Sequence, residues 1–199
     1  KKMALMEVNF FSKALMRPVT MNVILPVDKV FFGEETEEEN KPFKTLYLLH
    51  GVMGNYTDWV TGTCIKRWAE EKNLAVVMPS GANMFYMDHP NANENYSEFI
   101  GKELVKITRR MFPLSHKKED TFIAGLSMGG YGAIRNGLKY HDTFGYIAGL
   151  SSAMILEKWG QQMTVLLCSL RKKVFWRVYL EIYPGSKTVR SIRNGLPKI

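Results

Sequence analysis

Short apolar runs and longer amphipathic stretches take turns along residues 1–152 of this 199-residue chain. Mostly apolar runs, typical of strands buried inside a sheet, occur at 44–49, 74–78, 121–124 and 145–150. Helix-compatible stretches at 64–71, about 97–111 and 131–140 separate them. An opening pair at 7–13 and 19–26, turned at 16–18, is typical of antiparallel strands. This order predicts an α/β fold with a mostly parallel central sheet flanked by helices.

The stretch 97–111 has apolar residues at helical spacing, and we interpret their shared face as core and not as a cofactor site. They are Phe99, Ile100, Leu104, Ile107 and Met111. The acidic run 34–40 is interpreted as a solvated connection, not a metal site. No internal repeat or linker divides the chain. We therefore expect one core domain over residues 1–152, with 153–199 as an atypical basic tail that belongs to it or packs poorly.

Residues 125–129 fit the pattern G-x-S-x-G, between the apolar run 121–124 and the helix-compatible stretch 131–140. A serine on such a sharp strand-to-helix turn exposes its hydroxyl above the sheet, and the flanking glycines avoid collisions that a Cβ would cause. The helix N-terminus also favours negative charge on a bound oxygen. A chance match is the alternative for so short a motif. The strand-turn-helix context favours Ser127 as a nucleophile with strained backbone geometry.

The run 44–49 ends abruptly at His50 and Gly51. An ester hydrolase stabilises the oxyanion of its tetrahedral intermediate, usually with one amide after the nucleophile and one after an early strand. Met128 would supply the first amide and Val52 the second. An ordinary turn with a structural histidine is the alternative interpretation. The serine motif further along the chain favours the oxyanion hole.

Together these features resemble a known family. The runs 48–55, 76–79 and 121–133 are similar to those of small bacterial tributyrin-type esterases in the esterase D group, which also includes S-formylglutathione hydrolases, feruloyl esterases and mycolyltransferases. The similarity extends from about residue 3 to about residue 152. It implies an α/β-hydrolase fold, serine carboxylesterase activity on short, acetyl-type acyl esters, and an oxyanion hole from the amides of Val52 and Met128. It also implies that the stretch 84–88 lies beside the acyl pocket.

Nearly all of the net charge of +8 lies in the tail. Residues 1–150 carry 18 Lys+Arg against 17 Asp+Glu, whereas residues 151–199 carry nine against two. A basic tail can attract phosphate backbones without specificity. This tail, however, does not look like a continuation of the core domain, so we expect no nucleic-acid partner. No P-loop, dinucleotide fingerprint or metal-ligand cluster is present, and we expect neither cofactor nor metal. The expected partners are a small acyl-ester substrate and, as one way to cover an exposed sheet edge, a second copy of the chain.

Targeting features are also missing from the sequence. No apolar run reaches the ~18 residues of a membrane-spanning helix, and no signal-peptide layout opens the chain. Cys64 and Cys168 are far apart and lack metal-ligand spacing, so we interpret them as reduced thiols of a cytoplasmic protein.

A serine nucleophile needs a histidine base and a carboxylate that orients it, in the chain order Ser, Asp or Glu, His. After Ser127 the sequence has one histidine, His141, and one aspartate, Asp142. Both follow the 131–140 helix, roughly 15 Å from the serine at ~1.5 Å per residue. The triad therefore looks incomplete. Read in the neighbouring frame with ordinary codons, residues 175–184 are similar to what relatives carry, which suggests a frameshift near residues 157–162.

Three function classes remain open from the sequence. The first is a serine carboxylesterase. The second is an acyltransferase or thioesterase that uses the same serine. The third is a catalytically impaired α/β-hydrolase in which the serine motif is a relic. The motif set favours the first class, and the missing triad partners favour the third.

Overall fold

The computed structural model describes residues 4–27 and 41–153. The acidic run 34–40 and residues 154–199 of the basic tail lie outside the described residues. The main sheet has six strands in the order β1-β2-β4-β3-β7-β8. Their bounds are β1 Ala4–Ser12, β2 Arg17–Leu25, β3 Lys44–Leu49, β4 Leu74–Pro79, β7 Thr121–Leu126 and β8 Tyr146–Leu150.

The burial of each strand agrees with whether it pairs antiparallel or parallel. β1 pairs antiparallel with β2 and alternates half-buried with exposed positions, as an edge strand with one solvated face does. β2 pairs antiparallel with β4, while β3, β4, β7 and β8 run parallel. β3 and β4 are buried along nearly their whole length, because helices cover both faces of this part of the sheet. The predicted α/β architecture with a mostly parallel sheet is confirmed.

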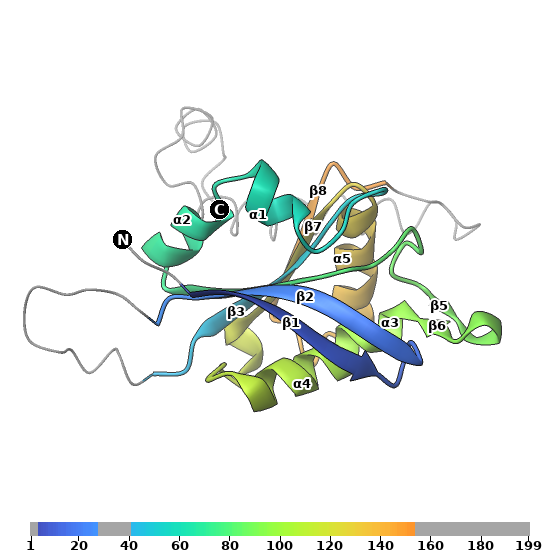
Figure 1. The fold of residues 1–199 in the computed structure, drawn as a ribbon, viewed down its shortest axis with the longest axis horizontal. Helices are drawn as coiled ribbons and strands as arrows, with labels where there is room; N and C mark the ends of the chain where they lie inside the picture. Colours follow the sequence, from blue (N-terminus) through green and yellow to red (C-terminus); the bar gives the residue numbers. More distant parts are fainter. Residues whose placement is uncertain (1–3, 28–40, 154–199) are drawn as a thin grey trace, which may run out of the picture. The chain divides into compact units, whose positions relative to one another are not determined.

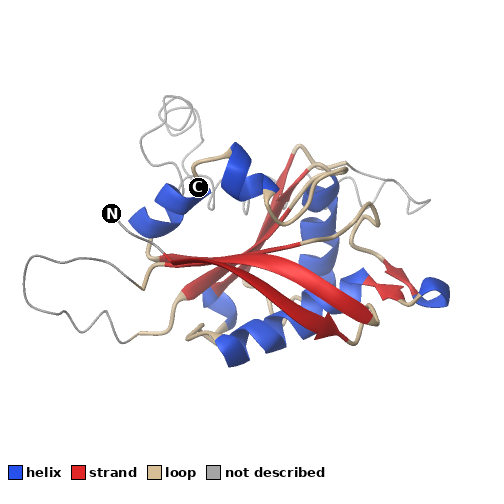
Figure 2. Cartoon of the chain, viewed as in Figure 1, coloured by secondary structure: helices blue, strands red, loops and turns tan. Residues whose placement is uncertain are grey.

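Helices lie on both sides of the sheet, as Figures 1 and 2 show. α1 (Asp58–Gly62) and α2 (Ile65–Glu71) lie on one side, where α2 packs on β2 and β4. α4 (Leu104–Met111) lies on the other side, and α5 (Met128–Lys139) packs on β3, β7 and β8. The shorter elements are β5 Asp88–His89, η2 Pro90–Ala92, β6 Glu94–Asn95 and η4 Lys118–Asp120. No helix within residues 4–27 and 41–153 is long and apolar enough to cross a membrane.

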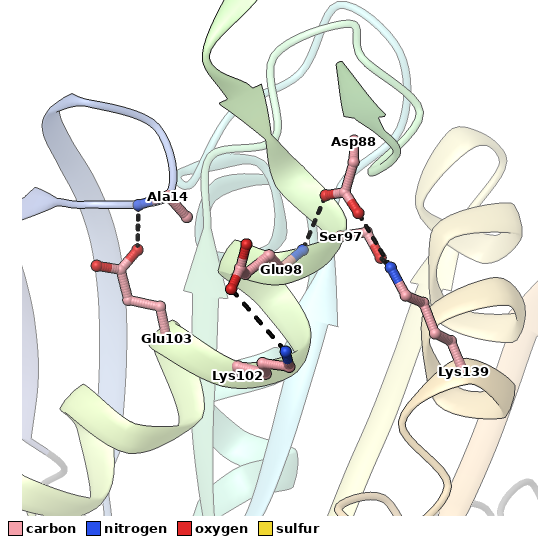
Figure 3. Close-up of polar contacts among 7 residues, drawn as sticks. All are labelled: Ala14, Asp88, Ser97, Glu98, Lys102, Glu103 and Lys139. Carbon is pink, nitrogen blue, oxygen red and sulfur yellow. Dashed lines mark hydrogen bonds and ion pairs between the residues drawn. The ribbon is translucent and has the colours of Figure 1, made fainter. Parts of the chain in front are cut away.

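The first hairpin turns earlier than predicted. β2 begins at Arg17, so the turn occupies residues 13–16 and not 16–18. The carboxylate of Glu103 accounts for this difference, because it accepts hydrogen bonds from the Ser12 hydroxyl at 2.6 Å and from the amides of Lys13 and Ala14 at 2.7 and 3.1 Å. Figure 3 shows this carboxylate pointing at the Ala14 amide. A contact over some 90 residues of sequence is invisible to local turn rules.

The predicted helix over 97–111 exists but is interrupted. It consists of α3 (Tyr96–Glu98), a π-helical segment η3 (Phe99–Glu103) and α4. A π turn holds more residues than an α turn, so it rotates the buried face of everything after it. Phe99, Ile100 and Leu104 are buried as predicted, but Met111 is 47% exposed and Ile107 only half-buried. Val105 and Thr108 occupy the buried positions instead.

Candidate active site

Ser127 lies on the turn between β7 and α5, where it is the N-cap residue of the helix. Its φ of 54° and ψ of −113° lie in a region that a residue with a side chain rarely adopts. Backbone hydrogen bonds hold it there: its amide donates to the Leu150 carbonyl at 2.8 Å, and its carbonyl accepts from Tyr131 and Ala153, each at 3.0 Å. The strained geometry expected of a nucleophile on a sharp turn is present.

Close packing explains both glycines of the motif. A Cβ on Gly125 would lie 2.9 Å from the Cα of Gly129 and nearer still to its carbonyl group. A Cβ on Gly129 would lie 2.5 Å from the carbonyl oxygen of His50 and nearer still to that of Leu49. These neighbours are backbone atoms that cannot rotate away. The turn can therefore approach β3 this closely only with glycine at both positions.

The register of the parallel strands brings the second loop of the predicted site beside Ser127. Leu49 pairs with Gly125, so the chain leaves β3 and β7 at the same edge of the sheet. A Cβ on Gly51 would lie 3.8 Å from the Cβ of Ser127. Val52 follows at 46% exposure, in a turn closed by the Gly54 amide and the Gly51 carbonyl at 3.3 Å.

Neither of the two predicted oxyanion amides donates a hydrogen bond to another residue of the described ranges. Met128 opens α5, where the first amides of a helix have no partner within it. The Val52 amide stands in the turn between Gly51 and Gly54, and the next amide along, that of Met53, donates to the side chain of Asn83 at 2.8 Å. Within the described residues, neither N–H group is therefore used by secondary structure or by a side chain.

His50 is buried, at 1% exposure, and both of its ring nitrogens are engaged. Nε2 accepts a hydrogen bond from the Gly81 amide at 2.8 Å, so the proton sits on Nδ1, which donates to the Gly51 carbonyl at 2.6 Å. Burial lowers the pKa of His50, although the hydrogen bond to Gly51 and the charge of Asp58 act in the opposite direction. His50 is thus a neutral, structural imidazole.

The hydrogen bond from His50 has a consequence for Val52. The carbonyl of Gly51 and the amide of Val52 belong to one peptide plane and, in a trans peptide, point in opposite directions. Fixing the carbonyl on the imidazole therefore fixes the direction of the Val52 N–H. The histidine of the His50-Gly51 pair positions an amide and is not itself a base.

Tyr86 also holds this loop in place through a hydrogen bond, a role that was not predicted from the sequence. Its fully buried hydroxyl donates to the His50 carbonyl at 3.1 Å. Its ring fills space that only glycines at 81 and 132 leave open, since a Cβ on Gly132 would lie 2.5 Å from Cδ2 of the ring. The side-chain Nδ2 of Asn136 donates to the Tyr86 carbonyl at 3.0 Å. The one sequence signal was its place in the aromatic stretch 84–88.

That stretch divides between two locations. The Phe85 ring packs edge-on against Tyr131, one turn into α5, with centroids 6.2 Å apart. Asp88, in contrast, accepts hydrogen bonds from the Glu98 amide and from the Lys139 ammonium, each at 3.0 Å (Figure 3). Lys139 ends the 12-residue helix that Ser127 begins, about 18 Å away at ~1.5 Å per residue. Within the stretch that was expected beside the acyl pocket, Phe85 thus lies near the first turns of α5 and Asp88 is bonded to its last residue.

Asp88 is an anchoring carboxylate. Burial pushes its pKa upward, but the hydrogen bonds from Glu98 and Lys139 outweigh burial and hold the pKa below its usual value. The ion pair ties the β5–β6 hairpin to the far end of α5.

All four histidines of the chain lie in the described ranges, at positions 50, 89, 116 and 141, and none forms a hydrogen bond with the Ser127 hydroxyl. His50 is engaged on both nitrogens. His141 follows the C-terminal end of α5, where its Nε2 lies 3.3 Å from Asp142 in an exposed pair. No histidine of the described ranges is thus bonded to Ser127, and the incomplete triad stays a prediction.

Strand order and serine geometry place the molecule among the α/β-hydrolases. A family model described as "Putative esterase" matches residues 12–187, and the chain belongs to this esterase family. It is 49% identical over 156 residues to an acetyl esterase of Caldicellulosiruptor saccharolyticus, a match that covers 78% of this chain and 59% of the relative. The chain thus spans less than two thirds of the length of that relative.

Two solved structures from Staphylococcus aureus are similar to the chain. The fluorophosphonate-binding serine hydrolase FphF is 36% identical, with a TM-score of 0.68, over 81% of this chain and 64% of its own. The S-formylglutathione hydrolase FrmB is 35% identical, with a TM-score of 0.66, over 88% of this chain and 70% of its own. Both likenesses agree with the α/β-hydrolase fold predicted from the sequence.

Proposed function

We propose that the chain provides the nucleophile and the oxyanion hole of a serine carboxylesterase for short, acetyl-type acyl esters. Ser127 is the nucleophile, and the amides of Val52 and Met128 form the oxyanion hole. The observation that carries the proposal is the strained Ser127 at the start of α5, beside a loop whose amide direction is set by His50. The acetyl esterase relative supports the choice of acyl group. The unpaired, exposed Cys64 is in keeping with a cytoplasmic location, which we propose as well.

The chemistry proceeds in two steps. The Ser127 hydroxyl attacks the ester carbonyl, and the negative charge that forms on the carbonyl oxygen is stabilised by the two amides and the N-terminus of α5. The alcohol leaves and an acyl-serine remains, which water then hydrolyses. A histidine base normally accelerates both steps. Without one at Ser127, both should be slow, and the acyl-serine should persist long enough to be detected.

Mass spectrometry of the protein after incubation with p-nitrophenyl acetate tests this function. We expect acetylation of the peptide that contains Ser127, released p-nitrophenol in step with it, and neither in Ser127→Ala. Peptide mapping separates this product from acetylated surface lysines. Equal release by wild type and Ser127→Ala, with no acetyl group on Ser127, would overturn the assignment.

A thioester serves as the comparison substrate, because one of the similar structures is an S-formylglutathione hydrolase. Acylation of Ser127 by the acetyl ester at a higher rate than by S-formylglutathione supports the carboxylesterase. The reverse order would favour a thioesterase that uses the same serine.

A further inference from the structure

A hollow of about 350 Å³ lies on the surface beside η3 and α4. Its lining includes Lys102, Lys106, Arg109 and Arg110, and His116 enters from the connection that follows α4. The other lining residues are small, apolar or uncharged, and no carboxylate lines it among the described residues. We call this set of residues the basic groove.

The basic groove is separate from the candidate active site. His116 precedes β7, whereas Ser127 directly follows that strand. Six residues of strand at ~3.3 Å each put about 20 Å between the two ends. The groove therefore lies at the amino ends of the parallel strands and the serine at their carboxyl ends.

Two nearby carboxylates, those of Glu103 and Asp120, are engaged elsewhere. Glu103 follows Lys102 in the chain but is turned toward the first hairpin, where it accepts hydrogen bonds from Ser12 and Lys13. It also accepts one from the Ala14 amide, which Figure 3 shows. Asp120 accepts a hydrogen bond from the Ser115 hydroxyl at 2.7 Å. Of the groove's cations, Lys102 has a carboxylate partner in the described ranges, the exposed Glu98 at 3.9 Å. An exposed pair of that length neutralises little of the field.

The groove is more than the solvated face of a helix. Arg109 is half-buried, and its guanidinium donates to the Thr121 hydroxyl at 2.9 Å, which holds it in place before any ligand arrives. Val105, at 4% exposure, provides an apolar floor. Arg109 and Arg110 bring planar guanidinium groups that match phosphate oxygens in pairs, and the lysines add mobile point charges. The volume falls in the range of small-molecule sites.

We propose that the basic groove binds a small ligand that carries two or more phosphate groups. This inference is independent of the esterase chemistry, because no residue of the groove takes part in the site around Ser127.

Isothermal titration calorimetry of the full chain with tripolyphosphate tests the proposal. We expect one binding site per chain, weakened about tenfold or more in the double variant Lys106→Glu, Arg110→Glu. The matched control is Lys66→Glu, Lys72→Glu, which changes the net charge equally at exposed positions on and next to α2. It should alter the affinity less than about threefold. Equal weakening by both double variants would show attraction to net charge and would overturn the site.

Two further probes decide the ligand class. Citrate carries a similar charge on carboxylates, and binding equal to that of tripolyphosphate would overturn the phosphate assignment. A duplex DNA that binds more tightly than tripolyphosphate, and is released by the groove variant, would assign the groove to nucleic acid instead.

The chain's own acidic run is the remaining competitor. The backbone of Phe43 pairs with Pro113 and Ser115, each at 2.9 Å, so the chain emerging from the five glutamates of residues 34–39 enters the fold next to His116. A variant with glutamine at those five positions tests this directly. If the wild type and the glutamine variant bind tripolyphosphate with similar affinity, the groove takes an external ligand. Binding that appears only in the glutamine variant would mean that the acidic run is the ligand, and the proposal would fail.

Discussion

The imidazole Nε2 of His50 accepts a hydrogen bond from the backbone amide of Gly81 at 2.8 Å. Because Nδ1 of the same ring donates to the Gly51 carbonyl at 2.6 Å, one neutral side chain joins the loop after β4 to the loop after β3. The second of these loops borders Ser127. A proton on Nε2 would break the bond to Gly81, so the link depends on pH.

The first prediction follows from the direction of the His50 pKa shift. Burial lowers this pKa in the folded protein, so the unfolded chain takes up a proton first as pH falls. Stability from His50 is therefore complete above the unfolded-state value of about 6.5 and is lost as pH falls from there through the lowered folded value. Denaturant unfolding at several pH values should show this slope in the wild type and a shallower one in His50→Asn. Identical slopes would contradict the structural role.

Tyr86→Phe gives the second prediction. The change removes the hydrogen bond to the His50 carbonyl but keeps the ring, so it should cost about 1 kcal/mol of unfolding free energy. Since that carbonyl belongs to the loop that orients the Val52 amide, acylation of Ser127 should also slow.

Tyr47→Phe is the matched control for Tyr86. Tyr47 is equally buried, and its hydroxyl bonds Thr108 at 2.8 Å, away from the loop. Thermal unfolding should show similar losses of stability for the two variants. Acylation of Ser127 by p-nitrophenyl acetate should be slower in Tyr86→Phe and unchanged in Tyr47→Phe. Equal acylation rates would remove Tyr86 from the positioning of the oxyanion hole.

Much of the fold was predictable because its signals are local. The strands at 44–49 and 121–126 and the helix after Ser127 are encoded by buried runs and by glycines at fixed positions. The hairpin turn and the buried face of the 97–111 helix were not, since one depends on Glu103 from a distant element and the other on a π turn. Long-range hydrogen bonds leave no periodic trace in a sequence.

The glycines of the serine turn supply the third prediction. Gly125→Ala would place a Cβ against the backbone of Gly129, and relief requires β7 and α5 to separate. We expect a loss of about 3 kcal/mol or more in unfolding free energy and no acylation of Ser127. Gly62→Ala is the control, because a Cβ there meets nothing within 4 Å, and its stability should be unchanged or slightly higher. A fully stable, reactive Gly125→Ala would mean that the turn is looser than the geometry indicates.

Glu103 supplies the fourth. Its carboxylate receives three hydrogen bonds from the turn between β1 and β2, so Glu103→Gln should cost about 1–3 kcal/mol and speed amide exchange at Lys13 and Ala14. Glu98→Gln, which loses an exposed contact of 3.9 Å, should change stability by less than about 1 kcal/mol. If amide exchange at Lys13 and Ala14 is the same in Glu103→Gln as in the wild type, the hairpin turn is stable without this carboxylate.

Parts of the candidate site were accessible to sequence reasoning and parts were not. The Ser127 turn and the position of the Gly51 loop could be predicted, because strand register brings the ends of parallel strands to one edge. The separation of Phe85 from Asp88 could not, since it arises from an ion pair with Lys139 at the far end of α5. The neutral state of His50 could not be predicted either, because it follows from both of its hydrogen-bond partners, Gly81 and Gly51.

The last prediction concerns the pH dependence of Ser127 acylation. A working histidine base gives a rate that rises as the imidazole loses its proton near neutral pH. His50 is engaged on both nitrogens and His141 lies at the opposite end of α5, so neither can take the serine proton in this geometry. Loss of a triad member typically costs on the order of 10⁴-fold, while the oxyanion hole and binding retain roughly 10³-fold over water. Acylation should therefore be residual, with no inflection around neutrality.

Three variants separate the alternatives for that residual rate. His141→Ala should leave it unchanged, and Ser127→Ala should abolish it. His50→Asn should lower it several-fold, since the Gly51 carbonyl loses its partner and the Val52 amide its fixed direction, but the shape of the pH profile should stay the same. Acylation rates by p-nitrophenyl acetate across pH 5–9 check all three. An inflection near neutrality that disappears in His141→Ala would show that this histidine reaches Ser127 after all, which requires the end of α5 to move.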